Sequence, residues 1–264
     1  MTIYVIKPST TKSKEVSIGS EKYVQLITGI GKFSIKMEQD KVIVTREDDD
    51  GWNHFMFLYE PKQITAYYMW GMKPGDTSEI PTDIIRKNDL LGITPLVSSK
   101  KDIERLLPMY PELHKIWDLI PHWITKADIG RLLLVHQFGN YYFDVDCEVL
   151  ESLPGDFTGV VLFIENIVSD LDQLGPREQK IPLRIANYAF GAGNSHHPFL
   201  SEVINESIRR IKKLLAIKDY LWTESDILWI GPDTITTVFH AHNWTDVYLF
   251  PKIANNQGFG SWRD

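Results

Sequence analysis

The chain has 264 residues, 43% of them hydrophobic, which is enough apolar sequence for one large domain or one domain with an appendage. Its formal net charge of −7 at pH 7 argues against nucleic acid as a partner, because a phosphate backbone binds to basic surfaces. Cys147 is the only cysteine, which excludes an intrachain disulfide, and no run approaches the roughly 18 consecutive apolar residues of a membrane span.

Residues 1–60 are predicted to form a β-rich extension. Segments 33–37 and 41–45 alternate apolar and polar residues around a polar turn, which is typical of a hairpin, and 53–59 adds a strand. The acidic run 47–50 is expected to be a solvated loop rather than a metal site. The chain begins without the basic and then apolar pattern of a signal peptide, so we expect a cytoplasmic protein.

From residue 61 onward, predicted strands and helices alternate, which favours a parallel α/β sheet. The predicted strands cover 64–70, 94–97, 141–145, 159–165, 184–191 and 248–250. The predicted helices cover 81–88, 101–107, 126–138, 199–215 and 232–242. The polar segment 168–182 is expected to be a loop.

The densest group of polar residues in apolar surroundings lies in 126–150. Thr125 is predicted to cap a helix together with Asp128, and Gly139 to end it. Asp128 and Arg131 are three residues apart, so we expect both to project from the same face of that helix.

Asp144 and Asp146 follow in the predicted strand 141–145. Side chains alternate along a strand, so both carboxylates are expected to point the same way at its carboxyl end. Paired carboxylates repel unless a cation accompanies them, and oxygen ligands suit Mg²⁺ or Mn²⁺, which also hold phosphate oxygens. Asp-x-Asp alone is weak evidence, because a role in capping the loop after the strand explains it equally well.

The combination of Asp128, Arg131, the long apolar helix and the segment from Gly139 to Asp146 is far more specific than its parts. It resembles the glycosyltransferases that have a sugar-binding region containing a DXD motif, a family that includes initiating mannosyltransferases of yeast and polysaccharide enzymes of bacteria and viruses. The large clostridial glucosylating toxins are distantly similar. Asn140 stands where the family usually has a second glycine, and asparagine tolerates left-handed backbone, so we expect the turn to be preserved.

The resemblance implies a GT-A type fold, which is a Rossmann-like mixed and mainly parallel sheet flanked by helices that binds a nucleotide sugar. The GT-A domain is expected over 61–264, after the β-rich extension of 1–60. The implied activity is metal-dependent transfer, with retention of anomeric configuration, to a glycan or polysaccharide acceptor. Mn²⁺ or Mg²⁺ is the expected cofactor, and a UDP-sugar is expected over a GDP-sugar as donor. Many eukaryotic relatives carry a Golgi anchor, so its absence here favours a bacterial or viral relative.

Four site residues follow from the resemblance within the central stretch. Asp128 and Arg131 are expected to contact the donor sugar. Asp144 and Asp146 are expected to hold the metal, the diphosphate and the ribose. No protein nucleophile is expected, because retaining enzymes of this kind are thought to use attack on the same face.

Further donor contacts are implied outside that stretch. Trp70 ends the first strand, where the family has a tryptophan near the base, although a core aromatic is an equal alternative. Asn187 lies in a segment similar to the family's Asn-Ala-Phe and is expected to face the donor. The segment Gly260-Ser261-Trp262 resembles a carboxyl-terminal signature that closes over the diphosphate, and Asn256, near the place of a usual histidine, is the candidate third metal ligand.

Two other classes of function remain open from the sequence. A phosphohydrolase of the haloacid dehalogenase type also has Asp-x-Asp after an apolar strand, but a small residue and threonine should follow, and here Cys147 and Glu148 do. A non-catalytic carbohydrate-binding module of transferase type predicts sugar binding without cleavage of the donor.

Overall fold

The computed structural model describes residues 64–76, 78–150, 153, 155, 157–167 and 181–250, together with the backbone of six further strands in 12–58 and 254–256. The chain divides into two compact units, Met1–Lys62 and Gln63–Asp264. Gly260, Ser261 and Trp262 lie outside the described residues, so their predicted role over the diphosphate stays a prediction.

The first unit contains an antiparallel sheet in which each strand pairs with the next one in the chain. Its strands are β1 (Lys12–Ile18), β2 (Glu21–Thr28), β3 (Gly31–Glu38), β4 (Lys41–Asp48) and β5 (Gly51–Leu58). The predicted hairpin corresponds to β3 and β4. The alternation of the sequence does not predict β1, because its residues KSKEVSI are mostly polar, and the predicted acidic loop is wrong in part, because β4 extends to Asp48.

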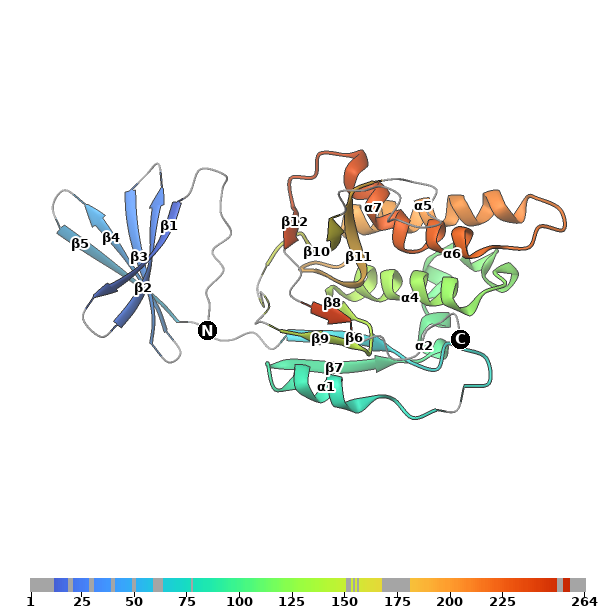
Figure 1. The fold of residues 1–264 in the computed structure, drawn as a ribbon, viewed down its shortest axis with the longest axis horizontal. Helices are drawn as coiled ribbons and strands as arrows, with labels where there is room; N and C mark the ends of the chain where they lie inside the picture. Colours follow the sequence, from blue (N-terminus) through green and yellow to red (C-terminus); the bar gives the residue numbers. More distant parts are fainter. Residues whose placement is uncertain are drawn as a thin grey trace. The chain divides into compact units, whose positions relative to one another are not determined.

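The second unit is built around a six-stranded sheet in the order β12-β10-β11-β8-β6-β7 (Figure 1). Its strands are β6 (Ile64–Met69), β7 (Ile93–Ser98), β8 (Asn140–Phe143), β10 (Val160–Ile167), β11 (Leu183–Ala192) and β12 (Val247–Phe250). Only β11 runs antiparallel to its neighbours. A separate two-stranded sheet pairs β9 (Cys147–Val149) with β13 (Ala254–Asn256). The predicted fold class, a mixed and mainly parallel sheet flanked by helices, is confirmed.

Helices cover both faces of this sheet, and Figure 1 shows α4 between the sheet and α5, with α1 beside β7. The helices are α1 (Thr82–Asp89), α2 (Lys100–Glu104), α3 (Pro111–His114), α4 (Trp123–Phe138), α5 (Pro198–Leu215), α6 (Glu224–Ile230) and α7 (Pro232–Ala241). Short 3-10 helices span Leu107–Met109 and Trp117–Leu119, so the predicted helix over 101–107 is too long. No helix in the described part of the chain has the length and hydrophobicity needed to cross a membrane.

Side-chain alternation along β6 explains why the unit has two cores. Tyr67 and Met69 face the core that contains α4 and α5. Ala66 and Tyr68 face the opposite core, where Ile85 of α1 packs. The last four of the six residues of β6 are buried, on both faces of the strand, as expected when helices cover both faces of a sheet.

Helix α4 positions the candidate site. It is buried on all sides, because every residue from Ala127 to His136 is buried. The predicted cap at Thr125 is wrong: the helix begins at Trp123 and Thr125 is buried inside its first turn. The half-buried Trp123 packs against the core, and this tertiary contact extends the helix beyond the local capping pattern. The predicted end is confirmed, since Gly139 has a φ of 69° and the following Asn140 a φ of 64°.

Candidate active site

The candidate site lies where the parallel strands of the sheet end. The carboxyl ends of β6, β7, β8, β10 and β12 share one edge of the sheet, because these strands run in the same direction. Open α/β sheets bind ligands outside such an edge. Trp70 follows β6 and Asp144 follows β8, so both lie at this edge.

Arg131 and two carboxylates form an ion cluster beneath this edge. Arg131 Nη2 lies 3.0 Å from Asp128 Oδ1. Arg131 Nη1 lies 3.0 Å from Asp144 Oδ1 and donates to Asp144 Oδ2 at 3.3 Å. The side chains of Arg131 and Asp128 are 6% and 7% exposed, whereas that of Asp144 is 26% exposed. A ligand arriving from solvent therefore meets Asp144 before the other two residues.

Asn187 and Tyr142 complete the cluster. The Asn187 Nδ2 donates to Asp128 Oδ1, and its carbonyl oxygen accepts from Arg131 Nη1, both at 3.0 Å. The Tyr142 hydroxyl donates to Asp144 Oδ1 at 2.6 Å, and the guanidinium of Arg131 lies 5.2 Å from the centre of the Tyr142 ring. The structure thus brings together Asn187, Asp128, Arg131 and Asp144, which the sequence places up to 59 residues apart.

The cluster holds its members in distinct protonation states. Burial raises the pKa of Asp128 to about 6; Asp144 adds to this rise, whereas Arg131 and Asn187 oppose it. Burial disfavours the charge on Arg131, but Asp144, Tyr142 and Asp128 outweigh it and raise its pKa, so the guanidinium stays positive. Burial also raises the pKa of Tyr142 well above its ordinary value, which keeps its hydroxyl a donor to Asp144.

The Asp-x-Asp motif forms a turn rather than the end of a strand. Strand β8 ends at Phe143, and the Cys147 amide donates to the Asp144 carbonyl at 2.8 Å, which closes the turn. The prediction of a strand over 141–145 is therefore too long, and strand alternation does not orient the two acids. Asp144 N–H still pairs with Tyr188 O of β11 at 2.9 Å, and the bond from Cys147 N–H to Asp144 O then turns the chain into β9.

The backbone of Asn256, the third predicted metal ligand, pairs with the strand that follows this turn. The register of β9 and β13 places Asn256 opposite Cys147, the residue after Asp146. Among the residues whose side chains are described, no group of three or more His, Cys, Asp or Glu is arranged to hold a metal ion. The metal roles of Asp144, Asp146 and Asn256 therefore stay predictions.

Trp70 is half-buried directly after β6. Its backbone N–H donates to Ser98 O at 3.1 Å, and its indole Nε1 donates to Ser78 O at 3.0 Å. These bonds hold the indole at the carboxyl edge of the sheet, and its contact with a base stays a prediction.

Sequence reasoning missed two residues of the site. Tyr142 lies within the predicted motif, and the signal that could have found it is its position two residues before Asp144, on the same face of the strand. Gly231, between α6 and α7, lies against the Asp128 carboxylate so closely that a Cβ there would overlap Oδ2. No local pattern indicates that contact, because 103 residues separate the two positions.

Comparison with known proteins identifies the family. The family model described as "Glycosyltransferase sugar-binding region containing DXD motif" matches residues 24–179, which is more than half of the chain. The chain belongs to this family. The matched part of this DXD glycosyltransferase includes Asp128, Arg131, Asp144 and Asp146, ends before Asn187 and starts within β2 of the first unit. Family membership makes the protein a glycosyltransferase and gives no support to the phosphohydrolase alternative.

Two solved structures match the chain at low identity. One is the "PaToxG Glycosyltransferase", with 16% identity and a TM-score of 0.42 over 69% of this chain and 70% of that chain. The other is a transferase mutant with two cysteine-to-serine substitutions, with 11% identity and a TM-score of 0.37 over 88% of this chain and 94% of that chain. No curated protein matches the DXD glycosyltransferase.

Proposed function

We propose that this DXD glycosyltransferase moves a sugar, with retention of anomeric configuration, from a UDP-sugar to a glycan or polysaccharide acceptor, using Mn²⁺ or Mg²⁺ and a catalytic domain over 61–264. The observation that carries the proposal is the fixed position of Asp144 at the carboxyl edge of the sheet. Arg131 and Tyr142 hold one of its oxygens, and Asp146 follows in the same turn.

The acids of the turn fit a hard divalent ion. Their ligand atoms are carboxylate oxygens, and both side chains are partly exposed at the edge where a nucleotide binds. Each carboxylate oxygen has more than one lone pair, so the bonds that Asp144 already makes leave it capacity to bind a cation. When bound, the ion supplies positive charge against the diphosphate that leaves.

The residues of the cluster contribute orientation and charge. Tyr142 and Arg131 fix the carboxylate of Asp144 before a donor arrives, so little reorganisation is needed on binding. Asp128 in turn fixes Arg131, and Asn187 contacts both. In the proposed reaction the bond between the anomeric carbon and the diphosphate oxygen breaks, and a bond from that carbon to an acceptor hydroxyl oxygen forms on the same face. The hydroxyl proton passes to the departing diphosphate.

Substitution of both acids of the turn tests the metal role. Asp144→Asn together with Asp146→Asn should lower turnover of the donor by at least about a hundredfold, because charge stabilisation of the leaving group is lost. Circular dichroism should show that the fold is retained. Glu148→Gln is the matched control, since Glu148 is the next acid along the chain and pairs with Lys87 at 2.9 Å. Wild-type turnover by the double variant would remove the metal from the proposal.

Thermal stabilisation by ligands tests the donor. A ligand that binds only the folded protein raises the melting temperature, by a free energy of about 2.7 kcal/mol at a hundred times its Kd. We expect UDP and its sugars to stabilise the protein in a metal-dependent way and more strongly than GDP or CMP. Stabilisation by sugars without cleavage of any donor would instead favour the non-catalytic binding module.

A further inference from the structure

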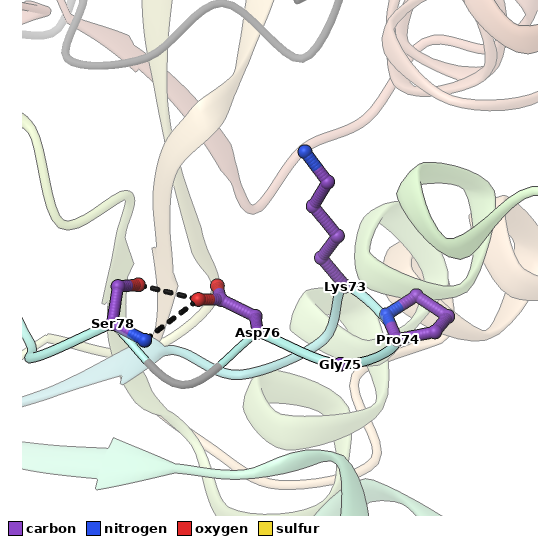
Figure 2. A pocket seen from close by; sticks show the side chains of 5 residues that line it. All are labelled: Lys73, Pro74, Gly75, Asp76 and Ser78. Carbon is purple, nitrogen blue, oxygen red and sulfur yellow. Dashed lines mark hydrogen bonds between the residues drawn. The ribbon is translucent and has the colours of Figure 1, made fainter.

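A pocket opens in the loop that connects β6 to α1. It has a volume of about 520 Å³ and is lined by Lys73, Pro74, Gly75, Asp76 and Ser78 (Figure 2). All five lining residues are exposed, so the pocket is open to solvent. None of these residues belongs to the site predicted from the sequence.

The loop is fixed to the predicted base-binding residue. Trp70 Nε1 donates to Ser78 O, and the Ser78 N–H donates to Asp76 Oδ1 at 2.9 Å. Figure 2 shows Asp76 and Ser78 pointing toward each other, while the ammonium group of Lys73 extends beyond the loop. The negative charge of Asp76 is therefore held within the loop, and Lys73 is the cation that lines the pocket.

Strand register places the start of this loop beside the Asp-x-Asp turn. In the parallel pair of β6 and β8, Ala66 lies opposite Tyr141 and Tyr67 opposite Tyr142. Strand β6 ends at Met69 and β8 at Phe143, so Trp70 and Asp144 follow neighbouring parallel strands at the same edge of the sheet. Lys73 comes only three residues after Trp70, so the loop that carries it begins at the same edge of the sheet as the Asp-x-Asp turn.

Charge balance indicates what the pocket binds. Three acids, Asp128, Asp144 and Asp146, accompany Arg131, whose guanidinium already contacts two carboxylates and the Asn187 carbonyl. A nucleoside diphosphate adds further negative charge, of which one divalent ion offsets only part. Lys87 on α1 is engaged with Glu148, but Lys73 presents a compact cation of the kind that binds phosphate.

We propose that Lys73 binds a phosphate group of the nucleotide donor in this pocket. The inference rests on the proposed function, because it assumes a nucleotide donor at the Asp-x-Asp turn. It assigns the loop after β6 to the phosphates, next to the base on Trp70.

Binding of UDP and of uridine, each with Mn²⁺, to Lys73→Met tests the inference by calorimetry. The variant should bind UDP roughly tenfold more weakly, because a charge-assisted hydrogen bond is lost, and uridine within about twofold of the unsubstituted protein. Lys73→Arg should recover most of the affinity. Lys218→Met removes the same charge from an exposed position outside the pocket and should bind UDP normally.

Four outcomes would overturn the inference. If Lys73→Met and the unsubstituted protein bind UDP equally well, Lys73 does not bind the phosphate, and the proposed function is unaffected. Equal losses for UDP and uridine, or a change confined to the KM of the acceptor, would assign the pocket to another ligand group. If the unsubstituted protein binds no nucleoside diphosphate with any divalent ion, both the inference and the proposed function fail.

Discussion

Replacement of Asp128 by asparagine should change how the stability of the protein depends on pH. Burial raises the pKa of this carboxyl from 3.8 to about 6 in the folded protein, so folding favours its protonated form. Ionisation of Asp128 therefore leaves the free energy of unfolding unchanged below pH 3.8 and lowers it progressively as the pH rises. The loss of stability is complete above about pH 6. The rise in pKa corresponds to about 3 kcal/mol. Asparagine has the same shape and does not ionise, so the variant escapes this cost.

Urea unfolding of both proteins between pH 4 and pH 8, in metal-free buffer, measures the effect. The free energy of unfolding of Asp128→Asn, relative to wild type, should increase by about 3 kcal/mol between pH 4 and pH 7 and then level off. Asp83→Asn, on the exposed face of α1, controls for the loss of one negative charge. A difference that stays constant with pH, or that changes in favour of wild type, would refute a raised pKa at Asp128.

Two further substitutions test the surroundings of the cluster. Gly231→Ala should lower the free energy of unfolding by about 1–3 kcal/mol and lower activity, because the new Cβ overlaps the Asp128 carboxylate. In an Asp128→Ala background, urea unfolding should show a smaller loss of stability for the same substitution. An equal loss in both backgrounds would contradict the contact between Gly231 and Asp128. Burial lowers the pKa of His136 to about 4, with His196 and His197 adding to the effect, so its contribution to stability is lost as the pH falls from 6.5 toward 4. The melting temperature of His136→Gln should therefore fall less than that of wild type between pH 7 and pH 4.5. A larger fall in the variant would count against a neutral, buried His136.

The sequence predicts the parts of the site that depend on local pattern. The end of α4 at Gly139 follows from backbone freedom, and the shared face of Asp128 and Arg131 follows from helical periodicity. The apolar runs that became β10 and β11 have the composition of buried strands. These features depend on residues close together in the chain, so a single sequence contains the information for them.

The remaining features depend on contacts between distant segments. The bond from Asp144 N–H to the Tyr188 carbonyl joins the start of the turn to β11, 44 residues later in the chain. Helix α4 begins before its apparent cap because Trp123 packs against the core. The pairing of β13 with β9, which brings Asn256 opposite Cys147, likewise joins segments more than 100 residues apart. Only the resemblance to the family suggested that Asn256 belonged near the motif.

The order of residues in this cluster has a consequence for biosynthesis. Asp128, Arg131 and Asp144 leave the ribosome before Asn187 and Gly231, which contact Asp128 and Arg131 in the folded protein. A nascent chain that ends within β10 therefore lacks the strand that supports the Asp144 turn and the glycine that accommodates the Asp128 carboxylate. The contacts of the cluster are therefore complete only after both Asn187 and Gly231 have been synthesised.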